Sequence, residues 1–128
     1  MKKIFAVLVL LVLSVALFAV QLSDLFIMAD DGTFLGTFEN KYATKSIFNK
    51  YSDYGSKYAT ESIFNKYGDY GSNYSEYSPF NKYASQAPWL YDFNGNCYGR
   101  LSVNKCANGV TNDSYDLACK LKALRDSM

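Results

Sequence analysis

Two short segments far apart in the chain carry the same pattern of apolar runs on either side of a turn. Residues 27–38 (IMADDGTFLGTF) place Asp-Asp-Gly between two apolar runs, and residues 90–101 (LYDFNGNCYGRL) place Asn-Gly between two others. Strand, tight turn and strand is the pattern of a β-hairpin. With one residue inserted, an aspartate and two glycines match: Asp30 and Asp92, Gly32 and Gly95, Gly36 and Gly99. Because a lone hairpin is marginal in water, we expect both hairpins in one antiparallel sheet.

The end of the chain has the apolar spacing of a helix. Leu117, Leu121 and Leu124 recur on one stripe, and basic residues gather near the end of the segment. Asp113 is suited to be the N-cap. We therefore predict a helix over residues 113–126 that packs on the sheet.

A tandem repeat fills the segment between the hairpins. Residues 42–57 (YATKSIFNKYSDYGSK) and 58–73 (YATESIFNKYGDYGSN) are identical at all but three positions, and a third copy, residues 74–88, degenerates towards its end. In the third copy Pro79 follows Ser78, which is typical of an N-cap and the first residue of a helix. Each repeat is therefore expected to form a short helical turn through Ser-Ile-Phe-Asn-Lys-Tyr, with the Phe and Tyr on one side of it.

Together these patterns predict an α+β fold with a mainly β core. It consists of two related β-hairpins in one antiparallel sheet, short-turn aromatic repeats between them and a C-terminal helix. A short stack of repeats is the alternative. Residues 21–128 are enough for a single small domain and too few for two.

The N-terminal segment indicates export. Lys2 and Lys3 precede an apolar run over residues 4–20 that only Ser14 interrupts, which is typical of a signal peptide covering residues 1–20. An uncleaved anchor is the alternative, because the run reaches the short end of a membrane span. We expect a periplasmic, cell-surface or secreted protein that meets a membrane only if the signal is retained.

Composition removes several kinds of chemistry. The chain has no histidine, which excludes Ser-His-Asp triads, Cys-His dyads and histidine-ligated zinc, and its three cysteines are too few for a four-thiolate site within one chain. No nucleophile has an evident base, so we expect no enzyme, no catalytic residue, no cofactor and no metal. The net charge of +1 disfavours nucleic acid as a partner.

One segment, residues 92–96 (DFNGN), is similar to the opening of a calcium loop. Val103 stands at the twelfth position of that loop, where the EF-hand template requires a glutamate. A hairpin turn is therefore the preferred interpretation, with calcium as the alternative.

The cysteines leave several pairings open. Cys97 matches Phe34 in the hairpin alignment, which predicts a buried, free thiol. Cys106 and Cys119 are then the candidates for a disulfide, with a Cys97–Cys106 bond, reduced thiols or an intermolecular bond as alternatives.

Tyrosine is the one feature unusual enough to suggest a function. Nine of the twelve tyrosines lie in residues 42–83, among Ser, Asn and Gly. Rigid amphipathic rings with adaptable polar neighbours suit recognition, and in an exported protein the natural ligand is a glycan. The candidate ligand-binding residues are Tyr51, Tyr54, Tyr67, Tyr70 and Tyr83. We expect a non-catalytic exported binding module, and the alternative is a structural or protein-interaction protein of the envelope with these rings as its core.

Two other residue types recur with the repeat. Lys50, Lys66 and Lys82 could line a cationic row for an anionic polymer, but acidic residues recur nearby and a solvated face is the preferred interpretation. The recurring asparagines are expected to bond the backbone in turns. They are Asn49, Asn65 and Asn81.

The string SIFNKYxDYGSxY, closed by SPFNKY and followed by the second hairpin, resembles a group of small exported bacterial proteins of unknown function with tandem Ser-Ile-Phe/Trp-Asn repeats. The resemblance covers about residues 40–105. It implies export and a common fold, and no activity. Cys97 is a departure, because it stands where an aromatic residue is expected.

Overall fold

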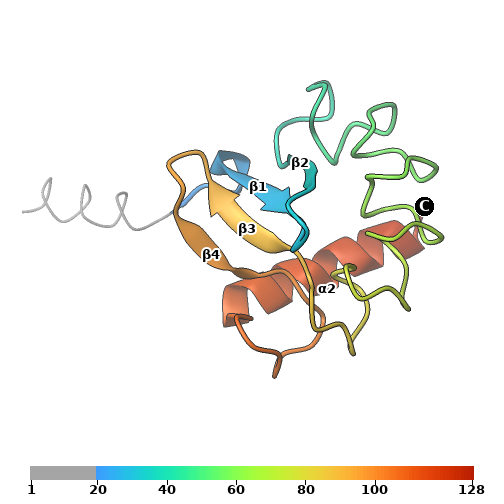
Figure 1. Cartoon of the computed structure of the whole chain (residues 1–128). Helices are drawn as coiled ribbons and strands as arrows, with labels where there is room; N and C mark the ends of the chain where they lie inside the picture. Colours follow the sequence, from blue (N-terminus) through green and yellow to red (C-terminus); the bar gives the residue numbers. More distant parts are fainter. Residues whose placement is uncertain (1–19) are drawn as a thin grey trace, which may run out of the picture.

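The computed structural model describes residues 20–128 (Figure 1). The predicted signal peptide and its alternative, an uncleaved anchor, lie outside the described residues except for Val20. A short 3-10 turn and four strands precede one helix: η1 (Leu22–Asp24), β1 (Leu25–Met28), β2 (Phe34–Thr37), β3 (Trp89–Asp92), β4 (Cys97–Arg100) and α2 (Asn112–Asp126). The predicted α+β, mainly β fold is confirmed. Within residues 20–128 no helix has both the length and the apolar character needed to cross a membrane.

The two hairpins share one antiparallel sheet in the order β2-β1-β3-β4, as predicted. Each residue of β1 pairs with one of β3, so the hairpins meet through their first strands. Leu25, Ile27 and Leu90 are buried on one face of this junction. Phe26 and Tyr91 are half-buried on the other face, with ring centroids 6.0 Å apart. Alternation of this kind lets one face of a sheet join the core while the other carries aromatic contacts.

The relation between the hairpins extends to the backbone. Gly32 and Gly95 have φ values of 90° and 89° in the two turns, and Gly36 and Gly99 have values of 116° and 104° in β2 and β4. Residues with a side chain rarely adopt such positive φ angles, so the backbone at these aligned positions requires glycine.

The repeats form a coil of tight turns, and the predicted helical turns are wrong. We call residues 40–84 the coil. At successive corners an amide donates to the carbonyl three residues earlier, as from Asn49 to Ser46 (3.2 Å) and from Ser52 to Asn49 (3.0 Å). The corner side chains prevent a helix from continuing, because each of these Ser and Asn oxygens accepts the amide two residues ahead. As a result Phe64 is 2% exposed whereas Tyr67 is 96% exposed, so the two rings do not share a side.

The coil is attached to both hairpins. Next to β2, Thr37 donates its amide to the carbonyl of Lys45 (2.8 Å) and accepts that of Ile47 (2.9 Å). Beyond β4, Val103 donates to the carbonyl of Pro79 (2.9 Å). Equivalent residues of the three repeats, which follow the recurring serine, are buried and extend the core of the sheet into the coil: Ile47, Ile63 and Pro79.

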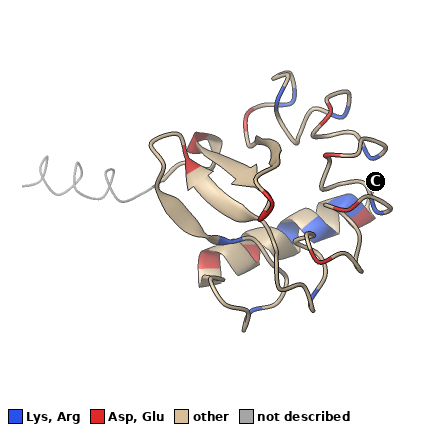
Figure 2. Cartoon of the chain, in the orientation of Figure 1, with Lys and Arg blue, Asp and Glu red and all other residues tan. Residues whose placement is uncertain are grey.

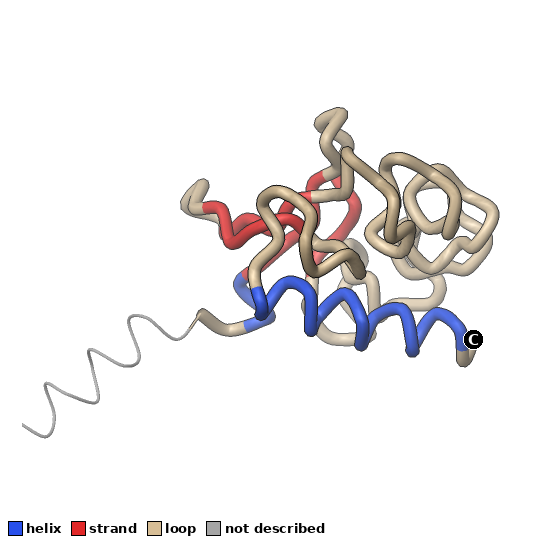
Figure 3. The backbone as a smooth tube through the Cα atoms, turned by 90° about the horizontal axis from the view of Figure 1, so that it is seen from below, coloured by secondary structure: helices blue, strands red, loops and turns tan. Residues whose placement is uncertain are grey.

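Helix α2 runs beneath both the sheet and the coil (Figures 1 and 3). Its N-cap is Thr111 rather than the predicted Asp113, because Thr111 and Ser114 exchange backbone-to-side-chain hydrogen bonds of 2.8 and 3.0 Å in a capping box. The buried stripe also differs from the predicted one, since Leu124 is 41% exposed. The buried residues of α2 are Ser114, Ala118, Leu121 and Arg125.

Arg125 joins α2 to the coil and is only 2% exposed. Its guanidinium donates to the carbonyl of Gly71 (2.5 Å) and to Oδ1 of Asn73 (2.7 Å), and it lies 4.7 Å from the ring centroid of Phe80. The guanidinium also pairs with Oδ1 of Asp126 at 2.8 Å, so a carboxylate, two carbonyl oxygens and an aromatic face together satisfy this buried cation.

The cysteines are free thiols in the structure. Cys97 is exposed, so its predicted burial is wrong. The aligned Phe34 is covered by the ring of Tyr54 from the coil at 5.1 Å, whereas Cys97 lies on β4 at the opposite edge of the sheet. Cys106 is exposed and Cys119 is half-buried, and no bond joins them in the structure. Their disulfide stays a prediction.

Candidate ligand-binding surface

Six tyrosines of the coil expose their rings. Their exposed fractions run from 78% to 96%. We call them the tyrosine row: Tyr42, Tyr51, Tyr58, Tyr67, Tyr74 and Tyr83.

One hydrogen bond recurs at every member of the row. Each tyrosine amide donates to the side-chain oxygen of the residue two positions earlier, at 2.9 to 3.2 Å. The acceptors are Asn40, Asn49, Ser56, Asn65, Ser72 and Asn81. Such turns fix the direction in which the chain leaves the corner, and they also precede rings that face inward, such as Phe64 and Tyr54.

The recurring asparagines make a second bond. The side-chain amides of Asn49, Asn65 and Asn81 donate to the carbonyl six residues earlier, at 3.0 to 3.1 Å. The prediction that these asparagines bond the backbone in turns is confirmed. Each one ties two neighbouring corners of the coil together.

The five candidate tyrosines divide into two groups. Tyr51, Tyr67 and Tyr83 belong to the exposed row. Tyr54 and Tyr70 pack against the core instead. The hydroxyl of Tyr70 lies 2.8 Å from Oδ2 of Asp31, to which it donates, and 3.1 Å from Oγ1 of Thr33. These two rings hold the coil against the first hairpin.

Sequence reasoning missed three members of the row, Tyr42, Tyr58 and Tyr74. A Ser or Asn two positions earlier is not the signal that separates them, because Tyr54 and Phe64 have one too. Five of the six come directly after a lysine. These lysine–tyrosine pairs are residues 41–42, 50–51, 57–58, 66–67 and 82–83.

The lysines of the pairs lie beside the rings. In four pairs the ammonium nitrogen stands 5.1 to 5.4 Å from the centroid of the adjacent ring. Such cation–π contacts at exposed sites are weak, about 0.5–1 kcal/mol. They favour a position of the charge beside the ring.

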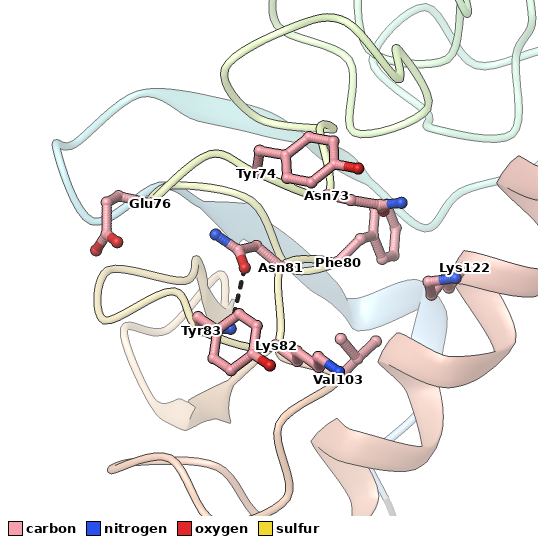
Figure 4. Close-up of a pocket in the computed structure, with 9 residues that line it drawn as sticks. All are labelled: Asn73, Tyr74, Glu76, Phe80, Asn81, Lys82, Tyr83, Val103 and Lys122. Atoms are coloured by element: carbon pink, nitrogen blue, oxygen red, sulfur yellow. Dashed lines mark hydrogen bonds between the residues drawn. The ribbon is translucent and has the colours of Figure 1, made fainter.

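Open clefts separate successive pairs. One cleft lies between pairs 41–42 and 50–51, the next between 50–51 and 57–58, and a third between 57–58 and 66–67. A further cleft lies between Tyr74 and Tyr83 (Figure 4), with Phe80 and Asn81 in its wall and Glu76 at the end opposite Lys122. The row is thus a series of rings with gaps between them.

In the hairpin turn at residues 92–96, both carboxylate oxygens of Asp92 accept hydrogen bonds from the same hairpin. Oδ1 of Asp92 accepts the amides of Asn94 and Asn96, and Oδ2 accepts the Asn96 side chain and the Tyr98 hydroxyl, all at 2.8 to 2.9 Å. The hairpin interpretation is confirmed. Among residues 20–128 no group of three or more Cys, Asp or Glu side chains could hold a metal ion.

Compared with models of known protein families, with curated proteins and with solved structures, the chain matches none of them.

Proposed function

We propose that the protein is a non-catalytic exported module that binds glycan along the tyrosine row. The observation that carries the proposal is the recurrence of six exposed rings along the coil, with open clefts between neighbouring rings. Large apolar rings left outside the core at regular intervals along a chain are typical of a binding surface.

The chemistry of the row suits sugars. A tyrosine ring offers an apolar face to sugar C–H groups and a hydroxyl at its edge for hydrogen bonding. Little side-chain entropy is lost when such a ring binds, and polar turn residues flank every ring. A row with several equivalent positions favours an extended chain, because each further sugar engaged adds binding without a new encounter.

A structural or protein-interaction role for the tyrosines is the alternative. A core role describes Tyr54 and Tyr70, which pack on the sheet. It does not describe the six members of the row, whose rings are open to a partner. Export is part of the proposal and rests on residues 1–20. The proposed relation to small exported bacterial repeat proteins rests on the resemblance over about residues 40–105.

Co-sedimentation of the purified protein with cell-wall sacculi and insoluble polysaccharides tests the glycan proposal. Replacing Tyr51 and Tyr67 together by alanine removes two exposed rings, so we expect binding to fall about tenfold or more. Stability should stay within about 0.5 kcal/mol, because both side chains are on the surface.

The matched control is Phe93→Ala. Phe93 is an exposed aromatic residue, at 64%, in the turn between β3 and β4. This variant should bind as the unchanged protein does. The proposal fails if the folded protein binds no polymer, or if both variants lose binding equally, and the first result would favour the structural or protein-interaction role.

A further inference from the structure

The tyrosine row carries positive charge at nearly every ring. Lysine precedes five of the six tyrosines, and the remaining one, Tyr74, follows Asn73. An exposed ring with no ligand would tolerate any polar residue before it, and polar residues other than lysine are common elsewhere in the chain. An ammonium thus recurs beside an aromatic face, an arrangement that suits a ligand able to contact both.

The acidic residues of the coil stay outside most of the clefts. No Asp or Glu side chain lines the three clefts between pairs 41–42 and 66–67, although Met128, the last residue, lines two of them. Figure 2 shows basic and acidic positions alternating along the coil. Glu76 lines the cleft beyond, where its carboxylate accepts the amide and hydroxyl of Ser85. The clefts lined by lysine without Asp or Glu therefore lie between Lys41 and Tyr67, a stretch that also carries Asp53 and Glu61 outside these clefts.

We propose that the ligand of this stretch is a linear anionic polysaccharide, one whose sugars carry carboxylate groups. This inference rests on the glycan-binding function proposed above and specifies its substrate class. Sugar faces would lie against the open faces of the rings, while carboxylates pair with the ammonium groups of Lys41, Lys50, Lys57 and Lys66. Each ammonium already stands beside a ring in the first three of these pairs, so one sugar unit meets both contacts.

The charge of the whole molecule disfavours a nucleic acid as the ligand. Lys and Arg number 13 against 12 Asp and Glu, a net charge of +1. Double-stranded DNA carries about one negative charge per 1.7 Å, and its binding depends on neutralising many phosphates at once. Isolated lysines separated by tyrosines match a polymer with sparser charge and apolar sugar faces.

The test compares matched polymers with and without charge. Binding of the purified protein to polygalacturonate, alginate and hyaluronate is measured against the methyl ester of each, in which the carboxylates are neutral. We expect at least one acid form to bind about tenfold or more tightly than its ester, and rising salt to reduce this difference.

Charge variants locate the effect. Replacing Lys50, Lys57 and Lys66 by glutamine should weaken binding of the acid form about tenfold and change binding of the ester little. Replacing three exposed lysines outside the clefts alters the net charge equally and should have little effect. These control positions are Lys45, Lys105 and Lys120.

Each other outcome has a distinct meaning. Equal binding of acid and ester, unchanged by the lysine substitutions, overturns this inference and leaves glycan binding standing. Absence of binding to every acid and every ester, by a protein that also fails to sediment with sacculi, overturns both proposals. Tighter binding of a duplex DNA fragment than of any polysaccharide overturns the choice of ligand class.

Discussion

Single side chains hold much of this structure by hydrogen bonds to backbone groups nearby, and Asp92 is an example. Its carboxylate accepts four hydrogen bonds within the second hairpin turn. These bonds, the one from the Asn96 side chain foremost, lower the pKa of Asp92 from 3.8 to about 2. A carboxylate that accepts several such bonds is favoured in its charged form.

The sign of this shift fixes how stability depends on pH. Because the pKa of Asp92 is lower in the folded protein, its stabilisation is complete above about pH 4 and is lost as the pH falls towards 2. We expect the unfolding free energy, measured with urea, to fall across this window. Asp92→Asn should be less stable at pH 7 and should lose less on acidification.

Asp53→Asn is the control for that experiment, since Asp53 is an exposed aspartate of the coil. Its acid dependence should follow that of the unchanged protein. An Asp92→Asn variant with an unaltered pH profile would contradict the role assigned to the turn.

The coil needs glycine where one turn passes close to the previous one. A Cβ on Gly55 would lie 2.0 Å from the carbonyl oxygen of Asn49, and a Cβ on Gly71 would lie 2.2 Å from that of Asn65. Both carbonyls belong to the corner asparagines that present the tyrosine row. The same close approach in two repeats shows that the geometry is a property of the repeat.

Gly71→Ala is therefore expected to destabilise the protein by about 2 kcal/mol or more, because backbone atoms cannot yield as a flexible side chain can. The change is measured by urea or thermal unfolding. Gly68→Ala is the matched control three residues away. There a Cβ would meet only the side chain of Asn65, at 3.1 Å, and the first repeat carries Ser52 at the same position.

Gly68→Ala should lower the free energy of unfolding by less than about 1 kcal/mol. Equal losses from both glycine substitutions would show that the close approach at Gly71 does not limit the coil.

Local patterns in the sequence were enough to predict the hairpins but not the conformation of the coil. The aligned glycines and the alternation around them identify the strands, because a hairpin is determined by residues close in sequence. Ser78-Pro79 has the local chemistry of a helix start, and the helix fails because the corner side chain of Asn81 accepts the next exposed amide. This competition repeats every few residues of the coil, so a capping rule applied to Ser78 alone predicts a helix that does not form.

The exposed row was partly predictable for the same reason. Asn-Lys-Tyr is a local signal, and it identifies Tyr51, Tyr67 and Tyr83. Tyr54 follows an aspartate and not a lysine, but its burial depends on Phe34 of the first hairpin, which packs against it. Contacts across the fold, and not the repeat itself, decide which rings turn inward.

At the scale of the molecule, α2 connects the sheet to the coil. Ala118 and Leu121 of the helix join the hydrophobic core with residues of both. One turn further, Arg125 bonds the second repeat at Gly71 and Asn73. Hydrophobic periodicity alone predicted Leu124 for that face, because nothing in the sequence reveals that coil carbonyls point at the helix.

The position of α2 makes the last turn of the helix a support for the ligand-binding surface. Arg125→Met keeps an apolar stem and leaves the buried carbonyl of Gly71 without its donor, so we expect a loss of about 2 kcal/mol in unfolding free energy. Hydrogen exchange should quicken in the second and third repeats more than in the sheet, since the lost bonds hold the coil. Lys122→Met is the control, because the bond from Lys122 to Asp126 is a partly exposed pair one turn apart, worth about 0.5 kcal/mol. If the two variants behave alike, or if exchange quickens first in the sheet, Arg125 does not hold the coil and the tyrosine row depends on its own turns alone.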